Sequence, residues 1–516
     1  MKYKQTKQDK ETIATGKAEL KRAKKEHAML LLSQKRENKQ LVALSNKQQK
    51  LERKESKRLH HQENQQVLIA HREQRREAIL NSTEYKIHQI AKRQNYKNLS
   101  WYKLDNAGLI YPPIAYKNNA LFRLSVLLNK EVNPLILQKA VNLIVPRFPT
   151  ICSTLKAGIF WYYLDSPSIP LIVEEETGLT CRTFRPDHKH PMIRVLYKQF
   201  EVAIEFFHTA TDGSGGLALF NCLLATYFEL SGYGEIKDRT NCPHYLDKPR
   251  YEETVDSFQT ARNNHKGKAE HVKASHIKGE ILPHHSVILR KAVCDSSSLV
   301  AVAKKYGCTI TQYLASRVLD SIHYQLKTTL NNDKKPIKVS IPCNLREKFN
   351  SCTYRNFSSY FYAYYKESDT FEQLIDSVKQ DFARQVNKEY FQNMINYNTN
   401  AQTNMWMRIA PLPVKNLALR LVYNAFGRTL NSSSLSNLGV VKAPREFSQH
   451  VVRYEFAFGE AFCEPIGVTM ASYNGLTVIT CSSIVKDTLF ERHLMSNLTK
   501  DGVQLCVEST YRGEQL

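Results

Sequence analysis

The sequence predicts an α/β protein of two lobes, each a mixed sheet flanked by helices, preceded by a long helical N-terminal arm. Strand and helix patterns alternate in two groups, at roughly 98–232 and 284–516. A polar stretch separates the groups, and the first 97 residues have the composition of an exposed helix. We therefore predict an arm at 1–97, a first lobe with a crossover linker (233–283) at 98–283, and a second lobe at 284–516.

The arm is rich in residues that favour helices. Residues 1–97 contain no proline, no cysteine and one glycine, and they hold +14 of the net charge of +24. Apolar residues repeat only in part at heptad, coiled-coil spacing, at Ala23, Leu30, Leu44 and Leu51. Three interpretations stay open for the arm: a solvated basic helix, a helix that docks a protein partner or another copy, and a segment that binds nucleic acid or an acidic surface.

The composition excludes several classes of protein. No apolar run approaches the roughly 20 residues that span a bilayer, and the first residues do not have the order of a signal peptide. The 11 cysteines form no CxxC pair, which is typical of reduced thiols in a cytoplasmic protein. The linker histidines are irregularly spaced and lack cysteine or carboxylate partners, so we predict no metal site.

The first lobe begins where tryptophan and proline enter the sequence, after residue 97. Asn133 followed by Pro134 predicts the start of a helix, with Asn133 as its N-cap. A hairpin is predicted at 195–208, and a helix with an apolar face follows at 216–232. The other predicted strands lie at 121–128, 151–155, 158–164 and 171–174.

The second lobe alternates helices and strands to the end of the chain. Residues 388–430 are predicted to be helical in pieces, broken at Pro411 and Pro413. The other predicted helices lie at 296–307, 309–326, 371–387 and 490–506. Strands are predicted at 285–293, 336–346, 356–365, 435–441, 454–460 and 466–484, the last range being a hairpin that turns at Asn474-Gly475.

The stretch 200–220 contains the candidate catalytic residues. A strand that alternates into the core ends at His208, and Asp212 and Gly213 follow just before a glycine-rich helix start. The pKa of a histidine lies near neutral pH, so an imidazole held at such a turn is suited to act as a general base. Gly213 lets the backbone pack tightly, and Asp212 can fix the loop through a basic partner. The alternative is a structural histidine that closes the strand, with Asp212 as a helix cap.

The segment HTATDG (208–213) resembles the HxxxDG motif of the chloramphenicol acetyltransferase-like superfamily. That superfamily includes peptide-synthetase condensation domains, plant BAHD acyltransferases and alcohol acetyltransferases, and the context is most similar to the last group. Further segments resemble blocks of these enzymes and occur in the same order: WYKLDNAGLIYPP (101–113), FRLSVLL (122–128), RFPT (147–150), GIFWYYL (158–164), IPCNLREKF (341–349), RNFSSY (355–360) and LSNLGVVKAP (435–444). This ordered set is more specific than the motif alone.

The resemblance implies two chloramphenicol acetyltransferase-like lobes with a tunnel between them, which coenzyme A and the acceptor enter from opposite faces. It implies that His208 is the general base and that Asp212 is structural and pairs with an arginine, for which Arg346 is our candidate. Ser436 or Asn437 would line the tunnel or orient the oxyanion, and a plain turn at a strand edge is the alternative for both. We expect no bound cofactor; acetyl-CoA, or another acyl-CoA, would be a co-substrate and a small hydroxyl-bearing molecule the acceptor.

The sequence also departs from the family patterns. Phe207 stands where condensation domains carry a second histidine, the DFGW-type signature of the plant enzymes is absent, and no carrier-domain serine motif is evident. These departures favour a free-standing alcohol O-acetyltransferase. N-acylation and transfer from a carrier protein use the same base and stay open. In a different class, the lobes would be a degenerate scaffold of a binding or assembly protein that acts through its basic arm.

Overall fold

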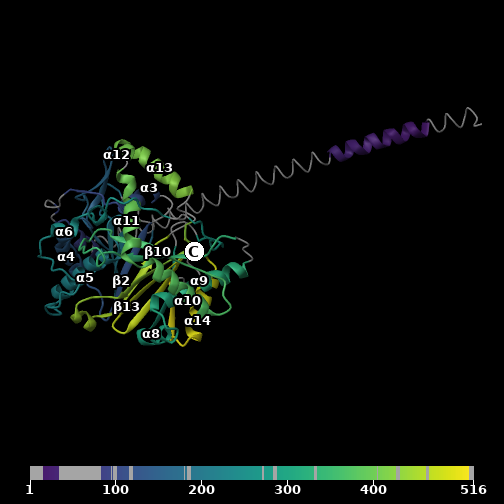
Figure 1. The fold of residues 1–516 in the computed structure, drawn as a ribbon. Coiled ribbons are helices and arrows are strands. Elements are labelled where there is room, and N and C mark those ends of the chain that lie inside the picture. The colour runs from purple at the N-terminus through teal and green to yellow at the C-terminus, as the bar shows by residue number, and fades with distance from the viewer. Residues whose placement is uncertain are drawn as a thin grey trace, which may run out of the picture. The chain divides into compact units, whose positions relative to one another are not determined.

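The computed structural model in Figure 1 divides the chain into two units, Met1–Tyr85 and Lys86–Leu516. The first contains a helix at 15–33 with exposed side chains, which agrees with the predicted helical arm. The predicted heptad positions Leu44 and Leu51 lie outside the described residues. The structure describes residues 15–33, 83–94, 96, 101–115, 120–178, 180–182, 187–269, 272–282, 287–329, 334–403, 405–425, 430–460 and 464–510.

Within the described residues, the strands of the larger unit form two large sheets and one small sheet. The first lobe has a five-stranded sheet in the order β12 (Val451–Phe458), β2 (Leu121–Leu128), β7 (Glu201–Phe207), β6 (Ile193–Lys198) and β5 (Val173–Glu175). The second has a seven-stranded sheet in the order β10 (Ser358–Tyr364), β9 (Lys338–Asn344), β11 (Ser433–Val440), β13 (Ile466–Tyr473), β14 (Leu476–Ser483), β8 (Ile288–Asp295) and β15 (Leu505–Ser509). The small sheet has the order β1 (Tyr102–Lys103), β4 (Tyr162–Asp165) and β3 (Thr154–Ala157).

Both large sheets are mixed, as the predicted fold class requires. The pairs β5–β6, β9–β11 and β11–β13 are parallel, and the other pairs in these sheets are antiparallel. Strand β12 comes late in the chain but pairs along its length with β2 in the sheet of the first lobe, where Phe456 faces Leu124. This strand therefore ties the second half of the chain to the first.

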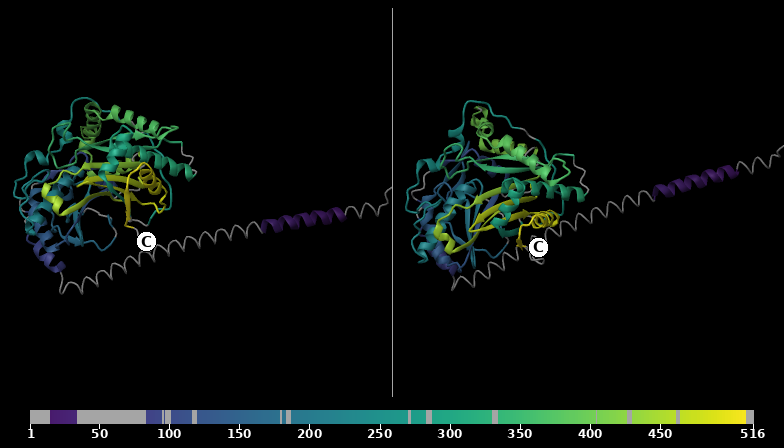
Figure 2. Two further views of the ribbon diagram at one scale, coloured as in Figure 1. Left: turned by 90° about the horizontal axis from the view of Figure 1, so that it is seen from below. Right: turned by 60° about the horizontal axis from the view of Figure 1, so that its bottom comes forward.

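Helices cover both lobes, as Figures 1 and 2 show. Helices α4 (Pro134–Ile144) and α5 (Gly213–Leu230) belong to the first lobe, and α8 (Ser296–Lys305), α9 (Ile310–Thr328), α10 (Phe371–Gln385) and α14 (Leu489–Lys500) to the second. Helix α11 (Lys388–Thr403) packs against β10, and α12 (Met405–Ile409) and α13 (Leu412–Ala425) lie at the outer edge of the fold, in green. The short helices are α2 (Thr83–Ala91), α3 (Tyr111–Ile114), α6 (Tyr251–Thr254) and α7 (Ser257–Ala261). No described helix is long and apolar enough to cross a membrane.

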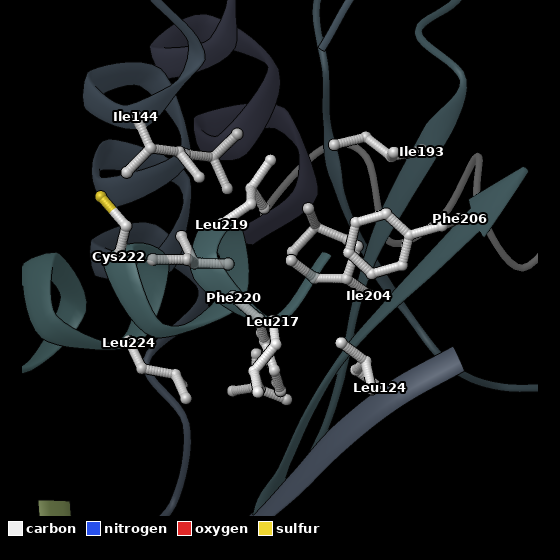
Figure 3. Packing of buried hydrophobic residues seen from close by; sticks show 14 of the residues in the cluster. Leu124, Ile144, Ile193, Ile204, Phe206, Leu217, Leu219, Phe220, Cys222 and Leu224 are labelled. Carbon is white, nitrogen blue, oxygen red and sulfur yellow. The ribbon is translucent and has the colours of Figure 1, made fainter. Parts of the chain in front are cut away.

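Helix α5 is the centre of the first core. Figure 3 shows its Leu217, Leu219 and Phe220 beside Leu124, Ile204 and Phe206 of the sheet. Every residue from Gly215 to Phe228 is buried. The sequence predicts one apolar face for this helix, but the structure buries it nearly all round because α4 packs against it. The burial fixes the start of α5, and with it the turn that carries His208.

The predicted caps and turns are present. The Asn133 side chain accepts hydrogen bonds from the backbone N–H groups of Leu135 and Ile136 at the start of α4. Asn474 and Gly475 both have positive φ, at 49° and 81°, between the paired strands β13 and β14.

The prediction of a helix at 490–506 is wrong in its last part. Helix α14 ends at Lys500, and β15 follows and pairs antiparallel with β8. Gly502 has φ of 106°, a conformation that favours glycine and stops the helix. Asp501 accepts hydrogen bonds from the Arg317 guanidinium, at 2.7 Å to Oδ1, which fixes this turn against α9.

Two further expectations are corrected by the packing. Pro413 does not break a helix, because it lies in the first turn of α13, where a missing backbone N–H is tolerated. The polar linker predicted at 233–283 contains α6 and α7 and buries Phe258. Its Glu253 is also buried and pairs with both terminal nitrogens of Arg147, at 2.8 and 2.9 Å.

Candidate active site

His208 follows the last residue of β7, and its ring is held on three sides. Its backbone N–H donates to the Ala120 carbonyl at 2.8 Å. Its ring stacks on Tyr111 with a centroid distance of 4.7 Å and meets the edge of Phe122 at 5.2 Å. Its Nδ1 lies 3.1 Å from Oδ1 of Asn356. The imidazole therefore has a fixed orientation.

The orientation of the Asn356 amide decides which imidazole nitrogen carries the proton. Its Nδ2 donates to the Thr209 carbonyl at 3.4 Å, so its Oδ1 faces His208 and accepts from Nδ1. Asn356 also hydrogen-bonds the buried carboxylate of Asp105, which Arg355 contacts through Nε at 3.3 Å. Nε2 of His208 is then the nitrogen with a free lone pair, the state that a general base requires.

Burial lowers the pKa of His208 below its ordinary value, and this effect outweighs the opposite effects of Asp212 and Asn356. A lowered pKa keeps the imidazole neutral at pH 7 and at somewhat more acidic pH. The environment thus favours the form that can accept a proton.

Asp212 is the N-cap of α5 and the centre of a buried ion pair. Its two carboxylate oxygens accept from the two terminal nitrogens of Arg346, each at 2.9 Å. It also accepts from the backbone N–H groups of Phe357, at 2.8 Å, and Gly215, at 3.1 Å. Burial by itself raises the pKa of Asp212, but Arg346 and these hydrogen bonds outweigh burial and hold the pKa below its usual range. The partner named from the sequence, Arg346, is thus in contact with Asp212.

The glycines at the start of α5 permit close approach. A Cβ on Gly213 would lie 3.2 Å from the Leu438 side chain. A Cβ on Gly215 would lie 2.2 Å from the Tyr354 carbonyl oxygen, which cannot move easily because it also accepts from Thr211. Gly215, which the sequence did not single out, is therefore the more constrained position of the two.

His208 lines a cavity of about 550 Å³. One part of its wall is apolar and aromatic, with Leu109, Ile110, Tyr111, Trp161, Met407 and Leu419. Another part is polar, with Ser340, Asn356, Ser358, Asn398, Asn431, Ser434 and Glu464. The lining residues come from both halves of the chain, so the cavity lies where the two lobes meet.

The polar part of the wall contains a connected group of side chains. Glu464 accepts from Asn431 Nδ2 at 2.8 Å and from the Ser434 hydroxyl, and Ser434 contacts the Ser340 hydroxyl at 2.6 Å. Burial raises the pKa of Glu464 above its ordinary value. This group can orient a polar atom of a bound molecule, while the apolar wall holds the rest of it.

Ser436 and Asn437 lie further along β11 than Ser434 and are not among the residues that line this cavity. Asn437 donates to the Thr311 hydroxyl at 2.9 Å and accepts from the Gly439 N–H at 2.6 Å. The structure brings His208, Asp212, Gly213 and Arg346 together around one turn. It places the other two candidates, Ser436 and Asn437, on β11 in the sheet of the second lobe.

Three residues of this site are missing from the sequence-based candidates: Asn356, Asp105 and Tyr111. Asn356 lies in RNFSSY, and Asp105 and Tyr111 lie in WYKLDNAGLIYPP, two segments that resemble blocks of the superfamily. A polar residue next to a phenylalanine in such a segment is the only available signal for Asn356. Its contact with His208 joins positions 148 residues apart, which no local pattern predicts.

No family model and no curated protein matches the sequence, but solved structures match the fold. Polyketide synthase associated protein 5 from Mycobacterium tuberculosis is 13% identical, with 78% of this chain and 98% of that chain covered and a TM-score of 0.50. The first condensation domain of the calcium-dependent antibiotic synthetase is 10% identical, with 80% and 100% covered and a TM-score of 0.53. TRI101 of F. sporotrichioides, complexed with coenzyme A and T-2, is 12% identical, with 79% and 99% covered and a TM-score of 0.52.

At these identities the similarity shows a shared fold. The chain has the two-lobed fold of condensation domains and chloramphenicol acetyltransferase-like acyltransferases, as the sequence motifs predict.

Proposed function

We propose that this protein transfers an acyl group from an acyl-CoA thioester to an acceptor hydroxyl, with His208 as the general base. The observation that carries this proposal is the state of His208: its ring lines a cavity, its Nδ1 is held by Asn356, and burial lowers its pKa. A histidine packed away from any cavity would instead favour a degenerate scaffold.

The reaction needs one proton carrier. Nε2 of His208 takes the proton of the acceptor hydroxyl as its oxygen attacks the thioester carbonyl carbon. The tetrahedral intermediate collapses, its carbon–sulfur bond breaks, and the coenzyme A sulfur takes the proton back from Nε2. The products are the ester and free coenzyme A, and His208 returns to its neutral state.

Stabilisation of the oxyanion requires a hydrogen-bond donor near the thioester carbonyl. Ser436 and Asn437 remain candidates from the sequence. The Ser358 hydroxyl is a further candidate, because it lines the cavity two residues after Asn356. Asp212, Gly213 and Arg346 would hold the turn that carries His208 and take no part in proton transfer.

The donor is proposed to be acetyl-CoA or another acyl-CoA, which the coenzyme A complex of TRI101 supports through the shared fold. The mixed wall of the cavity favours an acceptor with an apolar body and a polar reacting end. An alcohol fits this description, and an amine would use the same base.

The proposal is tested by acceptor-dependent release of free thiol from acetyl-CoA. We would incubate the full chain with apolar alcohols and the amines of the same carbon skeletons, detect the thiol by colour reaction, and identify the product by mass spectrometry. We expect saturable thiol release with alcohols and a matching ester. Failure of coenzyme A to bind, together with no thiol release across the panel, would favour the scaffold.

A further inference from the structure

Helix α13 presents an apolar stripe on the side that faces away from the cavity. Val414, Leu417, Leu421 and Val422 follow one another at helical spacing, and each is more than half exposed. On the other side of the same helix, Lys415, Asn416 and Leu419 line the cavity that contains His208. A helix normally buries its apolar side against a partner, and here the apolar side is the exposed one.

The stripe continues onto neighbouring segments. Ile409 of α12 and Ile159 and Phe160 of the turn between β3 and β4 are also exposed. This turn is bound to α13, because Leu412 N–H donates to the Ile159 carbonyl and Lys415 Nζ to the Phe160 carbonyl, both at 2.8 Å. We call the exposed set the outer patch: Ile159, Phe160, Ile409, Val414, Leu417, Leu421 and Val422.

Figures 1 and 2 show α12 and α13 at the periphery of the larger unit. An apolar surface of this kind marks an interaction site, whereas isolated exposed apolar residues do not.

The two helices of the outer patch carry charge of one sign. Neither α12 nor α13 contains an Asp or Glu residue. Arg408 lies on α12 and Arg420 on α13. A second copy of the chain seated on the same face would bring these cations against their own copies, which is unfavourable. An anionic surface would be attracted instead.

The aromatic composition supports a lipid surface in particular. Trp161 belongs to the turn between β3 and β4, and Trp101 precedes β1, which pairs with β4. Trp161 lines the cavity and lies under Lys415 Nζ, 3.4 Å from its ring centroid, and Trp101 is exposed and packs on Tyr163. Apolar stripes with flanking cations and tryptophan are typical of helices that lie in the membrane interface.

We propose that the outer patch docks on an anionic lipid bilayer, with α13 lying in the interface and the cavity directly beneath it. Apolar acceptors concentrate in bilayers, so docking would place the cavity next to its substrate. That last consequence rests on the proposed function, whereas docking itself does not.

Vesicle flotation with the full chain tests this proposal. The vesicles contain phosphatidylcholine and phosphatidylserine at about 7:3, and the buffer contains about 0.5 M NaCl, at which the screening length is roughly 4 Å. The salt suppresses long-range attraction by the basic arm and leaves apolar insertion. We compare wild type with the double variant Leu417→Gln, Leu421→Gln. We expect the partition coefficient of the variant between vesicles and buffer to be at least about 10-fold lower than that of wild type.

The matched control is Leu246→Gln with Val507→Gln, which removes two exposed apolar side chains outside the outer patch. This control and His208→Ala should float like wild type, so that loss of catalysis and loss of docking are separate results. Circular dichroism and thermal unfolding verify that each variant is folded.

Two results would overturn the proposal. The first is vesicle flotation of the double variant Leu417→Gln, Leu421→Gln (the stripe variant) equal to that of wild type, or no flotation of either protein. The other is a wild-type dimer in light scattering that the stripe variant converts to a monomer, without vesicle binding by either, which would assign the outer patch to a second copy.

Discussion

At the scale of single residues, the contacts of His208 determine which of its ring nitrogens carries the proton, which the residue type alone does not. The motif identified the histidine in the sequence, and the turn between strand and helix explained its exposure to a cavity. The hydrogen bond from Nδ1 to Asn356 and the stacking on Tyr111 depend on segments that come together only in the folded chain. These contacts select the tautomer, which the sequence could not do.

Replacing Asn356 by aspartate should shift the pH dependence of the reaction. In the proposed mechanism the neutral form of His208 is active, so kcat/KM falls as the pH falls through its pKa, which burial places below the ordinary 6.5. A carboxylate at position 356 would stabilise the imidazolium and raise that pKa. We expect the acid limb of the kcat/KM profile of Asn356→Asp to move to higher pH by about 1 unit or more.

Asn398→Asp is the matched control, because it adds a carboxyl to the same cavity wall at a different position. Its acid limb should move much less. An acid limb at the same pH in Asn356→Asp and wild type would show that His208 is not the group that titrates in the reaction.

At the scale of elements, the start of α5 determines where the turn with His208 lies. Asp212 caps the helix, pairs with Arg346 and accepts from Phe357 N–H, and so joins the helix to the segment that carries Asn356. The sequence suggested a cap and a brace as alternatives for Asp212. The structure shows that the same carboxylate makes both contacts.

Removing Arg346 should destabilise the fold strongly. Arg346→Ala leaves the Asp212 carboxylate buried without its counter-charge, and loss of one partner of a buried pair costs about 3–5 kcal/mol. Urea unfolding measures the loss. Arg384→Ala is the control, because its pair with Asp381 involves an exposed guanidinium and should contribute at most about 1 kcal/mol.

The contribution of the Asp212 carboxylate to the free energy of unfolding should also depend on pH. The folded-state pKa of Asp212 is lowered, so its contribution to stability is present above the unfolded value of about 3.9 and is lost as the pH falls below that value. The stability difference between wild type and Asp212→Asn should therefore shrink below about pH 4. Equal losses of unfolding free energy in Arg346→Ala and Arg384→Ala would contradict the claim that the buried pair of Asp212 and Arg346 stabilises the fold more than an exposed pair does.

Most elements could be predicted because their signals are local. The cap at Asn133, the turn at Asn474-Gly475 and the hairpin before His208 each depend on a few adjacent residues. The last strand, β15, could not be separated from the preceding helix, because its pairing with β8 is long-range. Periodicity also missed the burial of α5 on nearly all sides, since the covering helix α4 comes from a distant segment.

At the scale of the whole molecule, the two lobes are not independent along the sequence. Strand β12 from the second half completes the sheet of the first lobe, and the cavity wall draws on both halves. Patterns along the chain predicted two lobes, but not that a strand from the second half joins the sheet of the first lobe. The division at Tyr85 also leaves Ile87 and Ala91 of α2 buried in the larger unit.

Truncations should separate the arm from the larger unit. Removing residues 1–82 keeps α2, so we expect the thermal midpoint and the activity toward dissolved acceptors to be unchanged. Removing residues 1–97 deletes the buried Ile87 and Ala91 and the hydrogen bonds of Gln94 with Leu171. This loss should cost at least about 2 kcal/mol, measured by calorimetry and urea unfolding. Identical stability of the two truncations would show that α2 does not support the fold.

Proton transfer by His208 is tested most directly by comparing wild type with His208→Ala in thiol release from acetyl-CoA with a confirmed acceptor. We predict a loss of at least about 100-fold in kcat/KM, the usual scale for removing a general base, and partial rescue by added imidazole. Coenzyme A affinity and the thermal midpoint should stay close to those of wild type. Unchanged turnover in a folded His208→Ala variant would contradict the mechanism.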